Sequence, residues 1–126
     1  MDLKELRKIL HENAEESGYE VKTKQILKDF LCGHHGLVIE SHDDCSFYVF
    51  YDFHKEKTVM IRAEMDGISI ENQCRHACGH DGHMSMVCGV SERLNQVNDF
   101  SVNVLLVFQS SEETGAGALN ILNDPV

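Results

Sequence analysis

The sequence predicts an α/β fold, in which helices cover the faces of a mixed sheet. Two apolar segments, Thr58–Ala63 and Val102–Phe108, are rich in the β-branched and aromatic residues that strands favour. Such near-continuous apolar strands are typical of sheets buried on both faces. Segments with helical character follow both of them, Gly82–Leu94 after the first and Gly115–Leu122 after the second. Strands that alternate with helices in this way indicate an α/β sheet.

Two helices are expected before the first strand. Residues 2–17 form an amphipathic pattern that Gly18 would end, with apolar residues at helical spacing: Leu3, Leu6, Ile9 and Leu10. Thr23 is a candidate cap for a second helix, which Gly33 and Gly36 would end. One face of that helix is apolar: Ile26, Leu27, Phe30 and Leu31.

The extended part of the chain begins at Leu37–Ile39. A second strand is predicted over Phe47–Phe53, and the acidic stretch His42–Asp44 suits a hairpin turn between the two. The segment Cys74–Leu94 then lies between the two most apolar strands. It is polar and contains glycine at first, and it becomes helical from Gly82. We find no internal repeat, linker or low-complexity segment.

Composition places the chain among ordinary globular proteins. It has 126 residues, of which 42% are hydrophobic and 25% charged, and a formal net charge of −10. The negative charge argues against nucleic acids and anionic membranes as partners, because both would repel it. No segment is apolar for long enough to span a bilayer, and the charged N-terminus does not resemble a signal peptide. We therefore expect a cytoplasmic protein whose five cysteines are free thiols or metal ligands.

The densest cluster of reactive side chains is His76–His83, which reads His-Ala-Cys-Gly-His-Asp-Gly-His. Thiolate and imidazole are the ligands that zinc and similar ions prefer. The two glycines allow sharp turns that aim side chains at one point. Because the segment follows a strand and precedes a helix, we expect it to form a loop at the edge of the sheet. The alternative is an ordinary polar loop with scattered histidines.

A pair of carboxylates, Glu112 and Glu113, follows the strand that ends at Phe108. Adjacent side chains point in different directions, so one can bind a metal while the other acts as a general base. The alternative is a solvated acidic pair at the start of a helix, where negative charge suits the helix dipole.

A weaker signal lies at Arg62–Gly67, where Glu64 and Asp66 end the strand that begins at Thr58. Either carboxylate could bind a metal or steady its ligands, although Asp-Gly more often simply forms a turn. Five further histidines show no convergent partners and are interpreted as surface residues: His11, His34, His35, His42 and His54.

These elements, in this order, resemble a group of metallopeptidases that includes hippurate hydrolase, N-acyl-amino-acid amidohydrolases and plant auxin-conjugate hydrolases. The group's pattern His-Ala-Cys-Gly-His-Asp-x-His is matched fully by His76–His83. Its Arg-Ala-Asp-Met-Asp is echoed by Arg62–Asp66, and its Phe-Gln-Pro-Ala-Glu-Glu by Phe108–Glu113. The opening helices add a weaker match at Leu10, His11, Glu15 and Thr23. The resemblance spans essentially the whole chain.

The resemblance implies a metal-dependent amidohydrolase that releases a carboxylate and an amine from N-acyl amino acids or related small amides. By position, Cys78, His80 and Glu113 become metal ligands and Glu112 the general base. Asp66 becomes a residue that steadies the site. The implied cofactor is a pair of divalent ions, such as zinc, manganese or nickel. No ligand role is assigned to His76 or His83.

The sequence departs from the family pattern at several positions. Glu64 stands where the family usually has Asp, and Ser69, Ser110 and Ala14 stand where prolines are expected. The departure in length is larger, because the resemblance implies two further histidine ligands, a lid or dimerisation domain and closing strands beyond these residues. We therefore expect residues 1–126 to be a truncated N-terminal portion of a partial three-layer catalytic domain.

A chain with half of the site should hold at most one ion and be inactive alone. An incomplete sheet with exposed apolar edges should self-associate or need a complementing chain. Two alternatives stay open: a small module that binds a structural zinc, and an interaction protein that keeps the fold without catalysis. Glu112 discriminates a hydrolase from a structural zinc site, because only a hydrolase needs a free carboxylate beside the metal. A cysteine nucleophile is less favoured, because the neighbouring histidine is better placed to share a metal.

Overall fold

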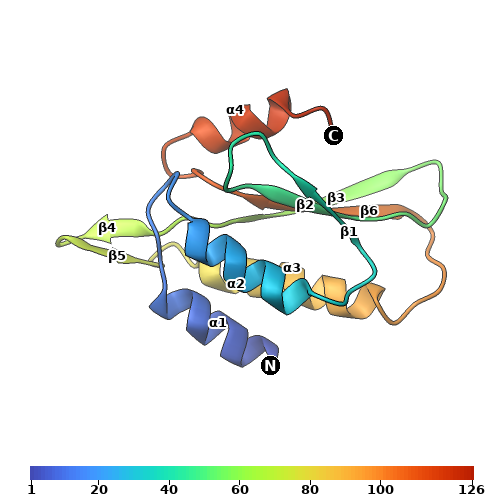
Figure 1. The fold of residues 1–126 in the computed structure, drawn as a ribbon, viewed down its shortest axis with the longest axis horizontal. Helices are drawn as coiled ribbons and strands as arrows, with labels where there is room; N and C mark the ends of the chain where they lie inside the picture. The colour runs from blue at the N-terminus through green and yellow to red at the C-terminus, as the bar shows by residue number, and fades with distance from the viewer.

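The fold is a four-stranded mixed sheet with helices on both faces. The computed structural model describes all 126 residues. The strands lie in the order β1 (Leu37–Glu40), β2 (Phe47–Tyr51), β6 (Asn103–Gln109) and β3 (Thr58–Glu64). β2 pairs antiparallel with β1 and β6, whereas β3 and β6 are parallel. Helices α1, α2 and α3 lie on one side of the sheet and α4 on the other (Figure 1). The predicted α/β class is thus confirmed.

The first helix, α1 (Leu3–Glu12), is shorter than the predicted helix over residues 2–17. It begins with a capping box in which Asp2 and Glu5 satisfy each other's backbone N–H groups. It ends where Asn13 folds its side chain back to donate to the carbonyl of Ile9 at 2.8 Å. The prediction was wrong beyond Glu12, because this polar cap ends the helix before the glycine.

The second helix, α2 (Val21–Leu31), begins two residues before Thr23, so Thr23 is not its cap. Both the backbone N–H and the hydroxyl of Thr23 donate to Oε1 of Glu15, at 2.6 and 2.8 Å. The N–H of Lys22 donates to the other Glu15 oxygen at 3.1 Å. A carboxylate six residues upstream of the helix therefore satisfies the donors of its first turn, an arrangement that local sequence rules do not anticipate.

The core lies between the sheet and the layer of α1, α2 and α3 (His80–Leu94). At its centre the rings of Phe47 and Phe108 stack with centroids 4.7 Å apart. Around them lie buried side chains from every one of these elements, among them Leu6, Leu10, Leu27, Met84, Cys88 and Leu106. This burial is the main force that fixes the helices on the sheet.

The two apolar strands differ in burial. Nearly every residue of β6 is buried, as a near-continuous apolar strand predicts. For β3 the same expectation was wrong: Val59 and Met60 are 47% and 58% exposed. β6 lies between two strands, whereas β3 is at the edge of the sheet and pairs with β6 alone. Edge strands lack a neighbour to cover them, whatever their composition.

The turn predicted over His42–Asp44 is confirmed between β1 and β2. Asp43 accepts from the N–H groups of Cys45 and Ser46, and Asp44 has a positive φ of 68°. β2 ends at Tyr51, before the predicted Phe53, because the N–H of Phe53 donates to the side chain of Asn103.

A small hairpin of β4 (Ile68–Ile70) and β5 (Gln73–Arg75) was not predicted. It projects beyond one end of the main sheet (Figure 1). Its turn residues Glu71 and Asn72 both have positive φ, which non-glycine residues seldom adopt. The hairpin was not predicted because its turn lacks the glycine that usually marks such a turn in sequence.

The last helix, α4 (Ala116–Asn123), contacts segments that adjoin the sheet at both of its ends. A Cβ on Gly117 would lie 1.8 Å from the carbonyl oxygen of Ser110, so only glycine permits this approach. At the other end the carboxylate of Asp124 accepts hydrogen bonds from Ser41, His42 and Tyr48.

Three of the histidines interpreted as unpartnered surface residues have partners. The ring of His42 contacts Asp124, that of His34 lies 2.8 Å from the hydroxyl of Ser91, and that of His11 lies 2.9 Å from Asp81. These partners are 57 to 82 residues away, so only the tertiary fold reveals them.

Candidate metal centre

The candidate site lies at the shared end of two parallel strands. Asp66 follows β3, and Glu112 and Glu113 follow β6. Parallel pairing of Ala63 with Phe108 brings the carboxyl ends of both strands to the same edge of the sheet. The N-terminus of α3 points to this edge as well, which is where open α/β sheets place their sites. Residues far apart in the sequence therefore meet here.

The cysteine–histidine segment is only partly a loop. The prediction of a loop over His76–His83 was wrong from His80 onward, because α3 begins at that residue. Gly79 adopts the left-handed conformation with φ of 79°, which a glycine tolerates at no steric cost, and the chain turns into the helix there. His80 and His83 are therefore three positions apart on one helix and share a face, while Cys78 precedes the turn.

Cys78, His80 and Glu113 come together as one candidate ligand set. One donor atom from each lies within 4.8 Å of the others. Nε2 of the buried His80 is 3.6 Å from Oε1 of Glu113, and Cys78 is exposed. The hydrogen bond to Glu113 raises the pKa of the Cys78 thiol, and burial and the nearby charge of Glu112 act in the same direction. A divalent ion would reverse this effect, because it favours the thiolate.

Asp66 holds two of these residues in place. The Nδ1–H group of His80 donates to the backbone carbonyl of Asp66 at 2.7 Å, which leaves Nε2 with its lone pair free. Oδ2 of Asp66 accepts from the backbone N–H of Glu113 at 2.9 Å and from the hydroxyl of Ser17 at 2.6 Å. The side chain of Asp66 is fully buried, and its Oδ1 has no hydrogen-bond partner.

Glu112 lies beside the set without belonging to it. It is half-buried, and its charge contributes to the raised pKa of Cys78. Of the two neighbouring carboxylates, Glu113 thus belongs to the candidate ligand set and Glu112 lies next to it. That division leaves one carboxylate available for proton transfer.

The segment that carries both carboxylates is held by Glu20, a residue that the sequence did not single out. The side chain of Glu20 is fully buried. It accepts from the hydroxyl of Ser110 at 2.6 Å and from the backbone N–H groups of Ser111 and Gly18, both at 3.0 Å. Ser111 itself has a positive φ of 58°. Glu20 therefore stabilises the sharp turn that directs Glu112 and Glu113 toward the site.

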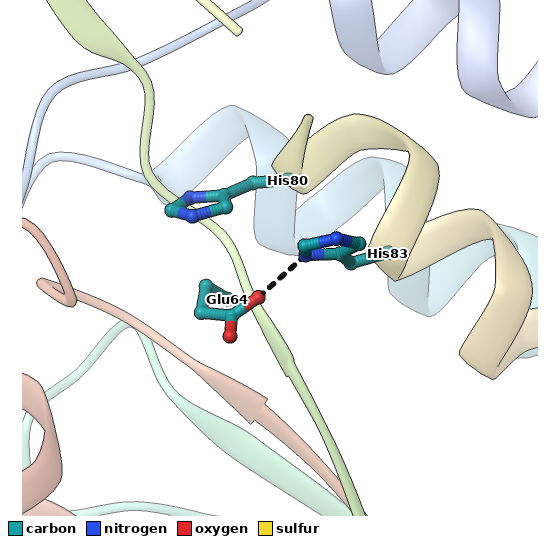
Figure 2. Close-up of side chains that lie close together, drawn as sticks. All are labelled: Glu64, His80 and His83. Atoms are coloured by element: carbon teal, nitrogen blue, oxygen red, sulfur yellow. Dashed lines mark hydrogen bonds and ion pairs between the residues drawn. The ribbon is translucent and has the colours of Figure 1, made fainter. Parts of the chain in front are cut away.

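A second group of potential ligands, Glu64, His80 and His83, lies next to the first. Nδ1 of His83 is 2.8 Å from Oε2 of Glu64 (Figure 2). Burial raises the pKa of the Glu64 carboxyl, but the hydrogen bond to His83 and the nearby imidazoles outweigh it and lower that pKa. No role was predicted for His83, because its partner is 19 residues away. His76 is buried with neither ring nitrogen hydrogen-bonded.

The donor atoms fit a borderline divalent ion. One thiol, one imidazole and one carboxylate make three protein ligands, the number that catalytic zinc sites use while a further position stays open. The supporting contact from the other ring nitrogen of His80 to a carbonyl is typical of metal-binding histidines.

Among the helices of the chain, none is both long and apolar enough to cross a membrane.

Comparison with known proteins places the chain in a family. The sequence profile of "Peptidase family M20/M25/M40" matches residues 58–125. N-acetyldiaminopimelate deacetylase of Priestia megaterium is 30% identical over 96% of this chain and 36% of its own length. IAA-amino acid hydrolase ILR1-like 5 of Arabidopsis thaliana is 31% identical over 93% of this chain and 30% of its own length.

A solved structure agrees with the fold. The YXEP protein of Bacillus subtilis, described as a dinuclear metal-binding peptidase of the M20 family, superposes with a TM-score of 0.87 at 28% identity. The match covers 95% of this chain and 37% of that one, so the chain spans about a third of the length of its relatives. Because the family profile matches more than half of its residues, the chain belongs to peptidase family M20/M25/M40.

Proposed function

We propose that residues 1–126 form the N-terminal portion of a catalytic domain that hydrolyses the amide bond of N-acyl amino acids or related small amides. The observation that carries this proposal is the ligand set of Cys78, His80 and Glu113 with Glu112 beside it. A site built only to hold a structural zinc needs no additional carboxylate at the ion.

In this proposal each side chain has a separate task. Cys78, His80 and Glu113 hold one divalent ion, zinc, manganese or nickel. When bound, the ion supplies Lewis acidity that polarises the amide carbonyl and acidifies water. Glu112 accepts a proton from the attacking water and then gives one to the leaving amine, as a general base and acid. Asp66 keeps His80 and Glu113 in place through the contacts described above.

The substrate class is supported by the names of the relatives. One is a deacetylase of N-acetyldiaminopimelate and another a hydrolase of IAA-amino acids. Both names describe an acyl group joined to an amino acid. We therefore propose a small N-acyl amino acid as the substrate and water as the second reactant.

Replacing Cys78 by serine should remove a sulfur ligand from the bound ion. We expect the wild-type chain to bind one equivalent of Co²⁺ and to show a near-ultraviolet thiolate-to-cobalt charge-transfer band. The Cys78→Ser variant should lack this band and bind Co²⁺ at least about tenfold more weakly, since even supporting residues change metal affinity about 10–100-fold. Absorption titration measures both quantities.

Cys32→Ser is the matched control, because Cys32 is also an exposed free cysteine but lies at the end of α2. Its titration should equal that of the wild type. If the wild-type chain showed no sulfur band, or if Cys78→Ser kept it, the proposed ligand set would be wrong.

The isolated 126 residues should show no amidase activity. The ligand set offers donors for one ion, whereas the resemblance implies a pair completed by histidines from outside these residues. Incubation of the purified chain with zinc and a panel of N-acyl amino acids, followed by assay of the free amine, tests this expectation. Glu112→Gln is the control for contaminating activity. Turnover by the wild type that Glu112→Gln abolishes would refute the need for a complementing chain.

A further inference from the structure

The second group of potential ligands comes from two elements that face each other. Glu64 is the last residue of β3, and His80 and His83 occupy the first turn of α3. Figure 2 shows one carboxylate oxygen of Glu64 directed at the ring of His83, with that hydrogen bond drawn and the ring of His80 nearby. One donor atom from each of the three lies within 4.8 Å of the others.

The surroundings of these residues suit a cation. Glu64 is largely shielded, with 15% of its side chain exposed, while His83 is 45% exposed and provides access from solvent. Oε1 of Glu64 is occupied by Arg62 at 3.3 Å, so Oε2 is the oxygen directed at His83. Two imidazoles and one carboxylate form a donor set that catalytic zinc sites also use.

The carboxylate of this group belongs to a residue that departs from the family pattern. Glu64 stands at a position where an aspartate is usual, and its side chain is longer by one methylene group. Oε2 of this side chain lies 2.8 Å from Nδ1 of His83. A neutral imidazole carries its proton on either ring nitrogen, and the tautomer protonated on Nε2 would leave Nδ1 of His83 free to bind an ion.

His80 belongs to both groups, and this restricts how they can be filled. Its Nδ1–H is committed to the carbonyl of Asp66, so only Nε2 has a lone pair to offer. A single lone pair binds one ion at a time. The two groups are therefore alternative positions for one ion rather than two sites that fill independently.

We propose that Glu64, His80 and His83 form a second, alternative position for a divalent ion, which competes with the Cys78 position for Nε2 of His80. The thiolate makes the Cys78 position the stronger one for zinc and cobalt. The Glu64 position takes over when the sulfur is missing. The inference rests on the proposed function in one respect, because the competing position is the proposed ligand set of Cys78. The Glu64 position itself can be tested in a variant that lacks Cys78.

The experiment removes the stronger position first. In Cys78→Ser we expect Co²⁺ to bind one equivalent and to give visible d–d bands with no sulfur band. Adding His83→Asn, or Glu64→Gln, to Cys78→Ser should weaken Co²⁺ binding by at least a further factor of about ten. The matched control is His54→Asn in the same background, because His54 is a largely exposed histidine far from α3 in the sequence. It should leave binding unchanged.

Two results would overturn the inference. One is a Co²⁺ affinity of Cys78→Ser that neither His83→Asn nor Glu64→Gln changes, with circular dichroism showing that all variants are folded. The other is tight binding of two equivalents by the wild type, which a shared lone pair does not permit. Failure of the proposed function would give a different result, namely the absence of the thiolate-to-cobalt band in the titration of the wild-type chain.

Discussion

Replacement of Glu20 by alanine should destabilise the chain by about 3 kcal/mol or more. Three donors would lose their acceptor: the hydroxyl of Ser110 and the backbone N–H groups of Ser111 and Gly18. The donors of Ser110 and Ser111 are buried, and each buried donor left unpaired costs roughly 1–3 kcal/mol. Small proteins have a total free energy of unfolding of only about 5–15 kcal/mol, so much of the stability would be lost. Urea denaturation followed by circular dichroism measures the change.

Two further variants make this test specific. Glu20→Gln keeps the volume and one acceptor oxygen, so its loss should be smaller than that of alanine. Glu12→Ala removes an exposed glutamate at the end of α1 and should change the free energy of unfolding by no more than about 0.5 kcal/mol. Equal stabilities for Glu20→Ala and Glu12→Ala would show that the buried carboxylate does not hold the Ser110–Ser111 turn.

Replacement of Asp66 by alanine should weaken metal binding about 10–100-fold. The backbone carbonyl of residue 66 would remain to accept from His80, but the N–H of Glu113 and the hydroxyl of Ser17 would lose Oδ2. Glu113 would then be free to move away from Cys78 and His80. Competition between the chain and a chromophoric chelator for zinc gives the dissociation constants of wild type and variant.

Asp52→Ala is the control for the removal of one negative charge, since half of the Asp52 side chain is exposed and it follows β2, away from the ligand set. It should bind zinc as the wild type does. An Asp66→Ala variant that is folded and binds zinc as tightly as Asp52→Ala would show that the candidate ligands keep their positions without Asp66.

The parts of the candidate site that the sequence predicted lie in short segments of the chain. Cys78, His80 and the Glu112–Glu113 pair lie in compact motifs whose residue types already indicate metal chemistry. For Glu64 the sequence suggested a role but not the pairing with His83, which lies 19 residues away. Glu20 was missed because a buried glutamate looks, in sequence, like any solvated one. Only the partners identify it, and Ser111 is 91 residues from Glu20.

The fold was predictable to a similar extent and for a similar reason. Hydrophobic periodicity located the strands and helices, since each element carries its own pattern. Burial of β3 was mispredicted because the exposure of a strand depends on which strands lie beside it. The residues of Thr58–Glu64 do not themselves indicate that the strand lies at the edge of the sheet. The end of α1 was misplaced because a side chain, that of Asn13, closed the helix early.

One departure from the family pattern has a physical counterpart in the structure. Ser110 stands where a proline is expected before the two glutamates. Its N–H donates to the hydroxyl of Ser46 at 2.9 Å, and its own hydroxyl donates to Glu20. A proline has no N–H group and no hydroxyl, so it could make neither bond. The serine thus replaces the rigidity of a ring with two buried hydrogen bonds.

The parallel pairing of β3 with β6 also bears on the order in which the molecule folds. The contacts that assemble the candidate site join residues 47 positions apart at Asp66 and Glu113, and 91 apart at Glu20 and Ser111. Contacts this distant require closure of long loops, which is slow and entropically unfavourable until much of the chain is already in place. We therefore expect the ligand set to form late in folding, so that a partly folded chain that displays Cys78 and His80 has not yet gained Glu113.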